Sequence, residues 1–316
     1  MPALFSFKKF LRAKLRSLAA IAGLMICSCS GLKEEHLLCE DLNLQTRSLL
    51  PSEAKEPNDL AGVSGWELVW SDEFNGPDGS RIDPTRWTAE VGGEGWGNRE
   101  RQYYTQQREN ATIENGCLVM TAIKESLDGV QCWYGPCEYT SARLNTQVKF
   151  ERTYGRFEAS IQVPQGQGIW PAFWLLGSNI ITEGWPACGE IDIMENIGKE
   201  PSIVHGTLHG PSYSSGNGIG GKHSLKPGQR FSNEFHVFAV EWEPQVIRWY
   251  VDGQVYQTRT PSDVPPGKAW VFDHPFFILL NLAVGGDWPG DANDTTVFPQ
   301  KMRVDYVRVY QRPSTK

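Results

Sequence analysis

The chain has 316 residues, a formal net charge of −7 and 21% charged residues. This mildly negative balance argues against a nucleic-acid partner and suits a neutral ligand. Gly, Trp and Tyr are abundant, and the chain shows no long helical heptads and no repeat with the period of a propeller or solenoid.

The N-terminus has the pattern of an export signal. Basic residues are concentrated within 8–16, and an apolar run follows at 18–26 that is too short to span a bilayer. The residues before Cys29 resemble a bacterial lipobox, with Ile26 at position minus three and Ser28 at minus one. We therefore expect residues 1–28 to be a lipoprotein-type signal peptide, with cleavage before Cys29 and lipidation of its thiol. An ordinary cleaved signal peptide is the alternative.

The next segment, 29–62, is polar and acidic and has no strong periodicity. It is typical of a flexible tether that holds a domain away from a membrane. We expect an exported protein of the bacterial cell envelope, namely an outer-membrane lipoprotein, or a secreted one if Cys29 is not lipidated. Residues 63–316 then form one domain, large enough to bury a core and expected to be monomeric.

This domain is predicted to contain many short strands separated by turn signals. Asp252-Gly253 is a hairpin turn signal, and 304–310 alternates cleanly between apolar and polar residues. The pattern predicts an all-β fold, a β-sandwich of jelly-roll type. The clearest strand candidates are 67–70, 117–122, 142–149, 155–162, 172–177, 190–195, 204–209, 236–243, 246–251, 276–283 and 302–311.

Four cysteines lie within the domain. Cys132 and Cys137 flank a turn-like sequence, so in an oxidising compartment they are the favoured disulfide pair. The pairing of Cys117 and Cys188 stays open. The histidines have no ligand spacing relative to these cysteines, which argues against zinc.

The most informative segment is 189–195, Gly-Glu-Ile-Asp-Ile-Met-Glu. On a strand, side chains alternate between faces, so Glu190 and Asp192 share one face. Buried acids are costly unless they are paired or functional. Glu195, five residues after Glu190, would lie on the opposite face of a regular strand. A β-bulge at 193–194 would bring it back beside the other two.

Close carboxylates are what glycoside hydrolysis requires, because one attacks the sugar and another transfers a proton. In this interpretation Glu190 is the nucleophile and Glu195 the general acid and base, with Asp192 assisting between them. An acidic strand that faces solvent and a cation site are the alternatives.

The aromatic residues favour the catalytic interpretation. Trp170, Trp174 and Trp185 precede Glu190 closely, and Trp96 and Trp288 lie in Gly-rich loops. Exposed indole faces stack on the apolar C–H faces of sugar rings. Core packing is the more natural interpretation for a second set, which lies in alternating strand patterns: Trp70, Trp242, Trp249 and Trp270.

The segment 189–196 resembles the signature of glycoside hydrolase family 16, in its laminarinase (endo-1,3-β-glucanase) branch. The extra residue Met194 is part of that likeness, because the related lichenase branch lacks it. Further segments resemble the same family, and together they cover nearly all of 65–311: 70–76, 95–105, 140–144, 170–174, 205–210 and 282–290.

The resemblance implies two curved antiparallel sheets with a substrate cleft on the concave side. It also implies retaining endo-hydrolysis of β-1,3 bonds in laminarin-like glucans by Glu190, Asp192 and Glu195, with no cofactor for catalysis. The residues expected by motif position to line the sugar subsites are Asn98, Arg143, Trp170, Trp174, Trp185, His209 and Trp288.

Many family members carry a structural calcium ion on the convex side. The matching ligands here would be the backbone oxygens of Glu73 and Gly116 and the carboxylate of Asp305. Oxygen ligands suit calcium. A strand acid facing solvent is the alternative for Asp305.

Three functional alternatives remain. A non-catalytic glucan-binding lectin on this fold would be expected to lack one or more of the acids, and all of them are present. A mixed-linkage β-1,3-1,4-glucanase is compatible with the motifs, whereas the laminarinase-like loops argue against a galactanase. A transglycosylase is also compatible, because a sugar can replace water in the second step.

Family members often have Asn at the position of Asp287, which changes the hydrogen bonding of one subsite.

Overall fold

The computed structural model describes residues 64–313. The expected signal peptide, Cys29 and the tether lie outside the described residues, so the boundaries at 28 and 62 stay predictions. Among the helices of residues 64–313, none has the length and apolar character needed to cross a membrane.

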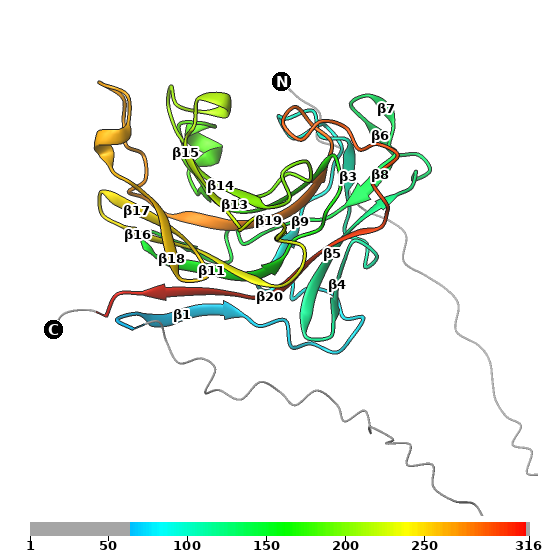
Figure 1. Cartoon of the computed structure of the whole chain (residues 1–316), viewed down its shortest axis with the longest axis horizontal. Helices are drawn as coiled ribbons and strands as arrows, with labels where there is room; N and C mark the ends of the chain where they lie inside the picture. The colour runs from blue at the N-terminus through cyan, green and yellow to red at the C-terminus, as the bar shows by residue number, and fades with distance from the viewer. Residues whose placement is uncertain (1–63, 314–316) are drawn as a thin grey trace, which may run out of the picture. The chain divides into compact units, whose positions relative to one another are not determined.

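The described residues form two large β-sheets that pack face to face (Figure 1). In the first sheet the order is β18-β17-β16-β11-β20-β5-β8-β3, with β1 beside β20 and β4 beside β5. Its strands are β1 (Glu67–Asp72), β3 (Gln102–Tyr104), β4 (Ala111–Glu114), β5 (Cys117–Lys124), β8 (Tyr139–Ser141), β11 (Gly155–Gln162), β16 (His236–Glu243), β17 (Val246–Val251), β18 (Gln254–Arg259) and β20 (Gln300–Gln311).

The second sheet has the order β15-β14-β13-β12-β19-β9-β2, with β10 beside β19. Its strands are β2 (Thr88–Ala89), β9 (Arg143–Asn145), β10 (Glu151–Arg152), β12 (Ile169–Gly177), β13 (Glu190–Glu195), β14 (Ile203–His209), β15 (Ile219–Ser224) and β19 (Phe276–Val284). Outside both sheets lie the small hairpin β6 (Gln131–Cys132) and β7 (Gly135–Pro136), the one-turn helix α1 (Ile180–Glu183), and 3₁₀ turns at Ser215–Asn217 and Pro261–Asp263.

One continuous apolar core fills the space between the sheets. It takes Phe157 from β11, Trp242 from β16, Phe173 from β12 and Leu280 from β19, each of them fully buried. Trp242 and Trp249 belong to this core as expected, and Trp70 and Trp270 pack against it while partly buried. The all-β sandwich predicted from the strand pattern is therefore confirmed.

Most predicted strands are present. Four of them, at 155–162, 190–195, 236–243 and 246–251, have the observed bounds. The strand predicted over 142–149 is wrong beyond Asn145, because Thr146 closes a turn by accepting the amide hydrogens of Lys149 and Phe150 at its carbonyl. Val148, in this turn, has a positive φ of 66° and is exposed.

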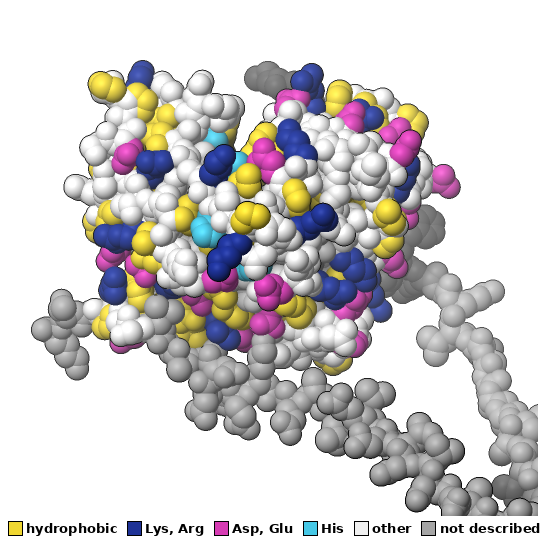
Figure 2. Space-filling model, in the orientation of Figure 1, with side chains coloured by type: hydrophobic (Ala, Val, Ile, Leu, Met, Phe, Trp, Pro, Cys, Tyr) yellow, Lys and Arg dark blue, Asp and Glu magenta, His cyan; other side chains and the backbone are white. Residues whose placement is uncertain are grey.

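The outer face of the second sheet is open. In Figure 1, β13, β14 and β19 lie above β11, β20 and β1, and loops rise on both sides of this upper layer. The surface is notched at the top of the same view (Figure 2). Side chains that leave β12, β13, β14 and β19 on the side away from the core therefore face this hollow.

Candidate active site

The site is built on β13, which contains a β-bulge. Across β12, Phe173 pairs with Met194 and Trp174 with Asp192, so Ile193 has no partner on that side. Across β14, Asp192 pairs with Thr207 and Glu195 with His205, which again leaves one extra residue on β13. Ile191, Ile193 and Met194 are buried in the core. The bulge required by the spacing is present, and it turns Glu195 to the same side as Glu190 and Asp192.

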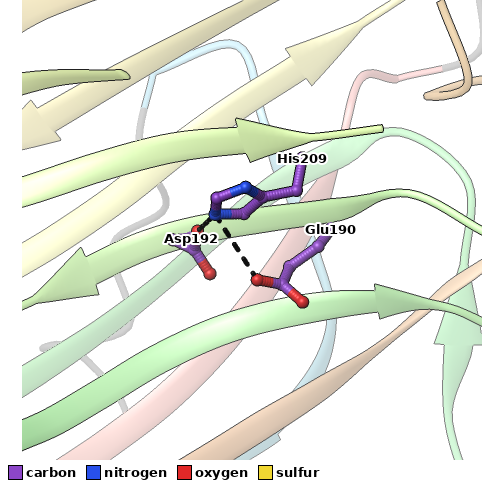
Figure 3. A group of neighbouring side chains, drawn as sticks. All are labelled: Glu190, Asp192 and His209. Atoms are coloured by element: carbon purple, nitrogen blue, oxygen red, sulfur yellow. Dashed lines mark ion pairs between the residues drawn. The ribbon is translucent and has the colours of Figure 1, made fainter. Parts of the chain in front are cut away.

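A histidine from the neighbouring strand lies between two of the acids (Figure 3). His209 pairs with Glu190 in the sheet register, and its Nε2 is 3.1 Å from Asp192 Oδ2 and 3.6 Å from Glu190 Oε1. Asp192 is 3% exposed, so this contact lies out of bulk water. The histidine expected at a sugar subsite thus contacts Glu190 and Asp192.

Two tryptophans donate to the outer acids. The indole N–H of Trp185 donates to Glu190 Oε2 at 2.9 Å, and that of Trp170 donates to Glu195 Oε1 at 3.0 Å. Trp185 is exposed, whereas Trp170 is 9% exposed. Trp170 therefore holds the Glu195 carboxyl group through its N–H and exposes little of its ring for stacking.

Burial raises the pKa of all three acids. It raises the pKa of Glu190 to about 8, with Asp192 adding to the rise, while His209 and the Trp185 N–H oppose it. Burial also raises the pKa of Asp192 to about 8. The pKa of Glu195 is raised by burial and by both neighbouring acids. Three buried carboxyls this close share protons near neutral pH.

The two outer acids are in different electrostatic surroundings. Asp192 and Glu190 both raise the pKa of Glu195, whereas Asp192 alone among the acids raises the pKa of Glu190. His209 and one indole N–H lower the pKa of each of the two, and Arg143 lowers that of Glu190 as well. We infer that Glu190 ionises before Glu195. A nucleophile must be ionised while its partner is still protonated, and this order provides that pair.

Arg143, on β9, is held in a cluster on the same sheet as the acids, with β12 and β19 between β9 and β13. Its guanidinium lies over the rings of Trp96 and Trp174, 4.7 and 4.8 Å from their centroids, and it is paired with Glu90. Trp174 also donates its indole N–H to Asn281 Oδ1 at 2.7 Å. The two aromatic contacts and the pairing with Glu90 fix the guanidinium, which can then donate to sugar hydroxyls.

Two loops bring Asn98 and Trp288 to this face. The backbone N–H of Asp287 donates to the carbonyl of Asn98 at 2.9 Å, and the side chain of Asp287 pairs with Arg99 at 2.5 Å. Arg99 and Asp287 are both exposed, so this ion pair contributes little to stability. Trp288 packs edge-on against Trp170, with ring centroids 5.5 Å apart.

Other predicted residues lie away from the acids. Cys132 and Cys137 form a disulfide that closes the β6–β7 hairpin. Glu73 follows β1, Gly116 lies in the turn between β4 and β5, and Asp305 lies on β20, all in the first sheet. The expected calcium ligands are thus separate from the catalytic face.

The sequence reasoning missed several residues of the site. His205 lies opposite Glu195 and packs edge-on against Trp288, with ring centroids 4.9 Å apart. The alternation of 203–209 places His205 and His209 on one face, so the sequence did contain a pattern that indicates His205 as a site residue. Glu90 and Asn281 had no such signal, because their partners are remote in sequence.

Comparison with known proteins agrees with this geometry. Residues 98–308 match the family described as glycosyl hydrolases family 16. The chain belongs to this family. A β-glucanase from Rhodothermus marinus is 46% identical over 257 residues, covering 78% of this chain and 85% of that protein.

Solved structures give the same result. The laminarinase catalytic domain of Thermotoga maritima MSB8 is 50% identical, with a TM-score of 0.73 over 78% of this chain and 98% of that chain. The endo-β-1,3-glucanase of Pyrococcus furiosus is also 50% identical, with a TM-score of 0.74 over 79% of this chain and 96% of that chain. The resemblance to family 16 is therefore confirmed, and the chain is a glycoside hydrolase with the jelly-roll fold.

The indole donors should set the pH dependence of kcat/KM. Removing a donor destabilises the ionised carboxylate and raises its pKa. Trp185→Phe should therefore move the acid limb, set by Glu190, up by about 0.5–1 pH unit, and Trp170→Phe should move the alkaline limb, set by Glu195, in the same direction. The measurement is kcat/KM from pH 4 to 10.

Trp174→Phe is the matched control, because its indole N–H bonds Asn281 and no catalytic acid. Its two limbs should stay in place whatever its effect on rate. If Trp185→Phe moved the alkaline limb instead, the assignment of the two acids would be reversed.

Proposed function

We propose that the protein is a retaining endo-1,3-β-glucanase that cleaves laminarin-like β-glucans. The observation that carries the proposal is the bulge of β13, which gathers Glu190, Asp192 and Glu195 on the open face of the second sheet beside His209. The presence of all three acids favours a hydrolase over a glucan-binding lectin.

Each step of the proposed reaction uses groups already described. Glu195 donates its proton to the glycosidic oxygen while a carboxylate oxygen of Glu190 bonds the anomeric carbon, and the leaving sugar departs as an alcohol. Glu195, now ionised, takes a proton from water, whose oxygen attacks the same carbon and releases Glu190. Asp192 lies between the two and shares a proton with Glu190, which limits the build-up of negative charge.

The sugar-binding residues divide around the acids. Trp185 and His209 adjoin Glu190, Trp170 adjoins Glu195, and Trp288 packs against Trp170. Arg143, with Trp96 and Trp174, lies further along the sheet, and Asn98 lies on the loop beside Trp96. Flat rings and fixed donors on one open face suit a polysaccharide that binds along its length.

Substrate and stereochemistry can be tested in one experiment. Laminarin and lichenan are offered separately, and early products are followed by proton NMR and separated by length. We expect laminarin to be the better substrate, internal cleavage to give a range of oligosaccharides, and the β anomer to form first. Glu190→Gln should lower kcat by roughly a thousandfold or more with the fold intact.

Each other outcome has a definite meaning. Faster release from lichenan would establish the mixed-linkage alternative, and early α anomer would exclude retention. Longer products that appear at high substrate concentration would indicate transglycosylation.

We propose a structural calcium site at Glu73, Gly116 and Asp305. Along one edge of β20, pairing with β1 ends at Val307 and pairing with β5 begins at Val304. Asp305 lies in this gap, and it is also the extra residue of a bulge opposite β11. The carboxylate of Glu73 is bonded twice by Arg308, at 2.9 and 2.7 Å, so its backbone oxygen is the group left for an ion. These observations support an oxygen site.

Calcium should then stabilise the protein without being needed for chemistry. At calcium 100-fold above its Kd, the melting temperature should rise by about 5 °C or more over protein treated with a chelator. Asp305→Asn should abolish this rise, and the exposed Asp294→Asn is the matched control that should keep it. An equal rise in Asp305→Asn would refute the site.

We also propose that the chain is exported and anchored to a bacterial membrane through a lipid on Cys29. The basic, apolar and lipobox segments of 1–29 support this localisation. Cells expressing the full chain should place it in the detergent phase of a Triton X-114 extract, and Cys29→Ser should move it to the aqueous phase. If the unaltered chain and Cys29→Ser both partition into the aqueous phase, the result would favour a secreted enzyme.

A further inference from the structure

The hairpin of 131–137, closed by its disulfide, exposes a tryptophan that is not among the residues of the candidate active site. We call this segment the disulfide hairpin. Cys132 and Cys137 are joined with their Cα atoms 5.1 Å apart, and β6 pairs with β7 inside the ring. In Figure 1 the hairpin is among the segments that rise beside the upper layer, at the opposite end from β15. At its tip lies Trp133.

Trp133 is fixed in place although 46% of it is exposed. Its indole N–H donates to the carbonyl of Glu100 at 2.7 Å, and its backbone N–H donates to that of Gly93 at 2.9 Å. A Cβ at Gly95 would lie 3.0 Å from its Cδ1, so the ring lies closely over a residue without a side chain. An exposed indole held at three points loses little conformational entropy when a ligand covers it.

The residue that follows Trp133 in the turn is also held in place. The hydroxyl of Tyr134 donates to the carbonyl of Arg101 at 2.6 Å, and the guanidinium of Arg101 lies 4.1 Å from the centre of the tyrosine ring. Trp133 packs edge-on against Tyr134, with ring centroids 5.4 Å apart. These contacts and the disulfide hold the indole in one orientation.

Trp133 adjoins a loop that already carries sugar-binding residues. The glycine beneath its ring, Gly95, immediately precedes Trp96, whose own ring contacts Arg143. Asn98 follows in the same loop. Trp133 is therefore continuous with the Arg143 end of the proposed substrate face, away from the acids.

We propose that Trp133 is an additional sugar-binding residue, which stacks on a glucosyl unit of the β-glucan at the end of the substrate face beyond Trp96. This proposal rests on the proposed function for the class of substrate. The residues around the indole favour a sugar over a protein or a lipid surface. Glu94, Asn98 and Arg99, in the loop that contains Gly95, are exposed and polar, so polar groups that can bond sugar hydroxyls lie in the same loop as the glycine beneath the ring.

A remote stacking residue affects long substrates selectively. In a ladder of β-1,3-linked gluco-oligosaccharides, Trp133→Ala should lower kcat/KM about two- to tenfold for chains long enough to reach the hairpin. The shortest cleaved oligosaccharide should be unaffected within about twofold. Trp133→Tyr should restore most of the loss, because it keeps a stacking face.

Two controls separate this role from a structural one. Phe235 is similarly exposed, at 40%, and precedes β16 in the other sheet, so Phe235→Ala should change no substrate selectively. The double variant Cys132→Ser, Cys137→Ser should reproduce part of the loss on long chains, because the hairpin is no longer closed.

The outcomes are decisive. If Trp133→Ala lowered kcat/KM equally for short and long oligosaccharides, or lowered it for none of them, the proposal would be overturned. If the wild-type enzyme cleaves none of these oligosaccharides, the proposed function fails instead. Calorimetric titration of long-chain laminarin and lichenan oligosaccharides into Glu190→Gln, with and without Trp133→Ala, then tests the stacking separately. Equal affinity for both proteins would again overturn it.

Discussion

The bulge in β13 is the constraint on which the active site depends. A strand of this sequence without a bulge would direct Glu195 into the core and Met194 toward the substrate. The bulge reverses both at once, since Met194 is fully buried and Glu195 accepts a hydrogen bond from Trp170 on the open face. The extra residue is tolerated because the core gains an apolar side chain where the catalytic face gains an acid.

Gathering three acids in this way places an electrostatic cost on the fold. Burial raises the pKa of all three acids. Asp192 also raises the pKa of Glu190 and of Glu195, and Glu190 raises that of Glu195. The surroundings offset part of the cost through His209, which lowers the pKa of Glu190 and of Glu195, and through neutral donors, because Trp185 and Trp170 each donate one indole N–H. A fixed cation would hold an acid permanently ionised, whereas an indole stabilises the charge and still lets the proton move.

Local patterns made β13 and its bulge predictable. The spacing of Glu190, Asp192 and Glu195 had to be reconciled with a period of two, and only a bulge does so. The turn at Thr146 was not predictable, because 142–149 has a strand-like composition and the side-chain hydroxyl of Thr146 decides the turn by donating to the carbonyl of Phe150 at 2.8 Å. Contacts such as that of Glu90 with Arg143 join segments that are remote in sequence, so no local sequence pattern predicts them.

The bulge is also held from behind, by the other sheet. Trp249 of β17 donates its indole N–H to the carbonyl of Asp192 at 2.7 Å, immediately before the extra residue. This large ring fits only because Gly206, on β14, leaves room for it: a Cβ there would lie 2.4 Å from Trp249 Cδ1 and 2.5 Å from the hydroxyl oxygen of Tyr256. A buried carbonyl that lost this bond would be left unsatisfied. The position of the acids is therefore set by inter-sheet packing as well as by β13, which explains how a locally irregular strand can hold a catalytic geometry.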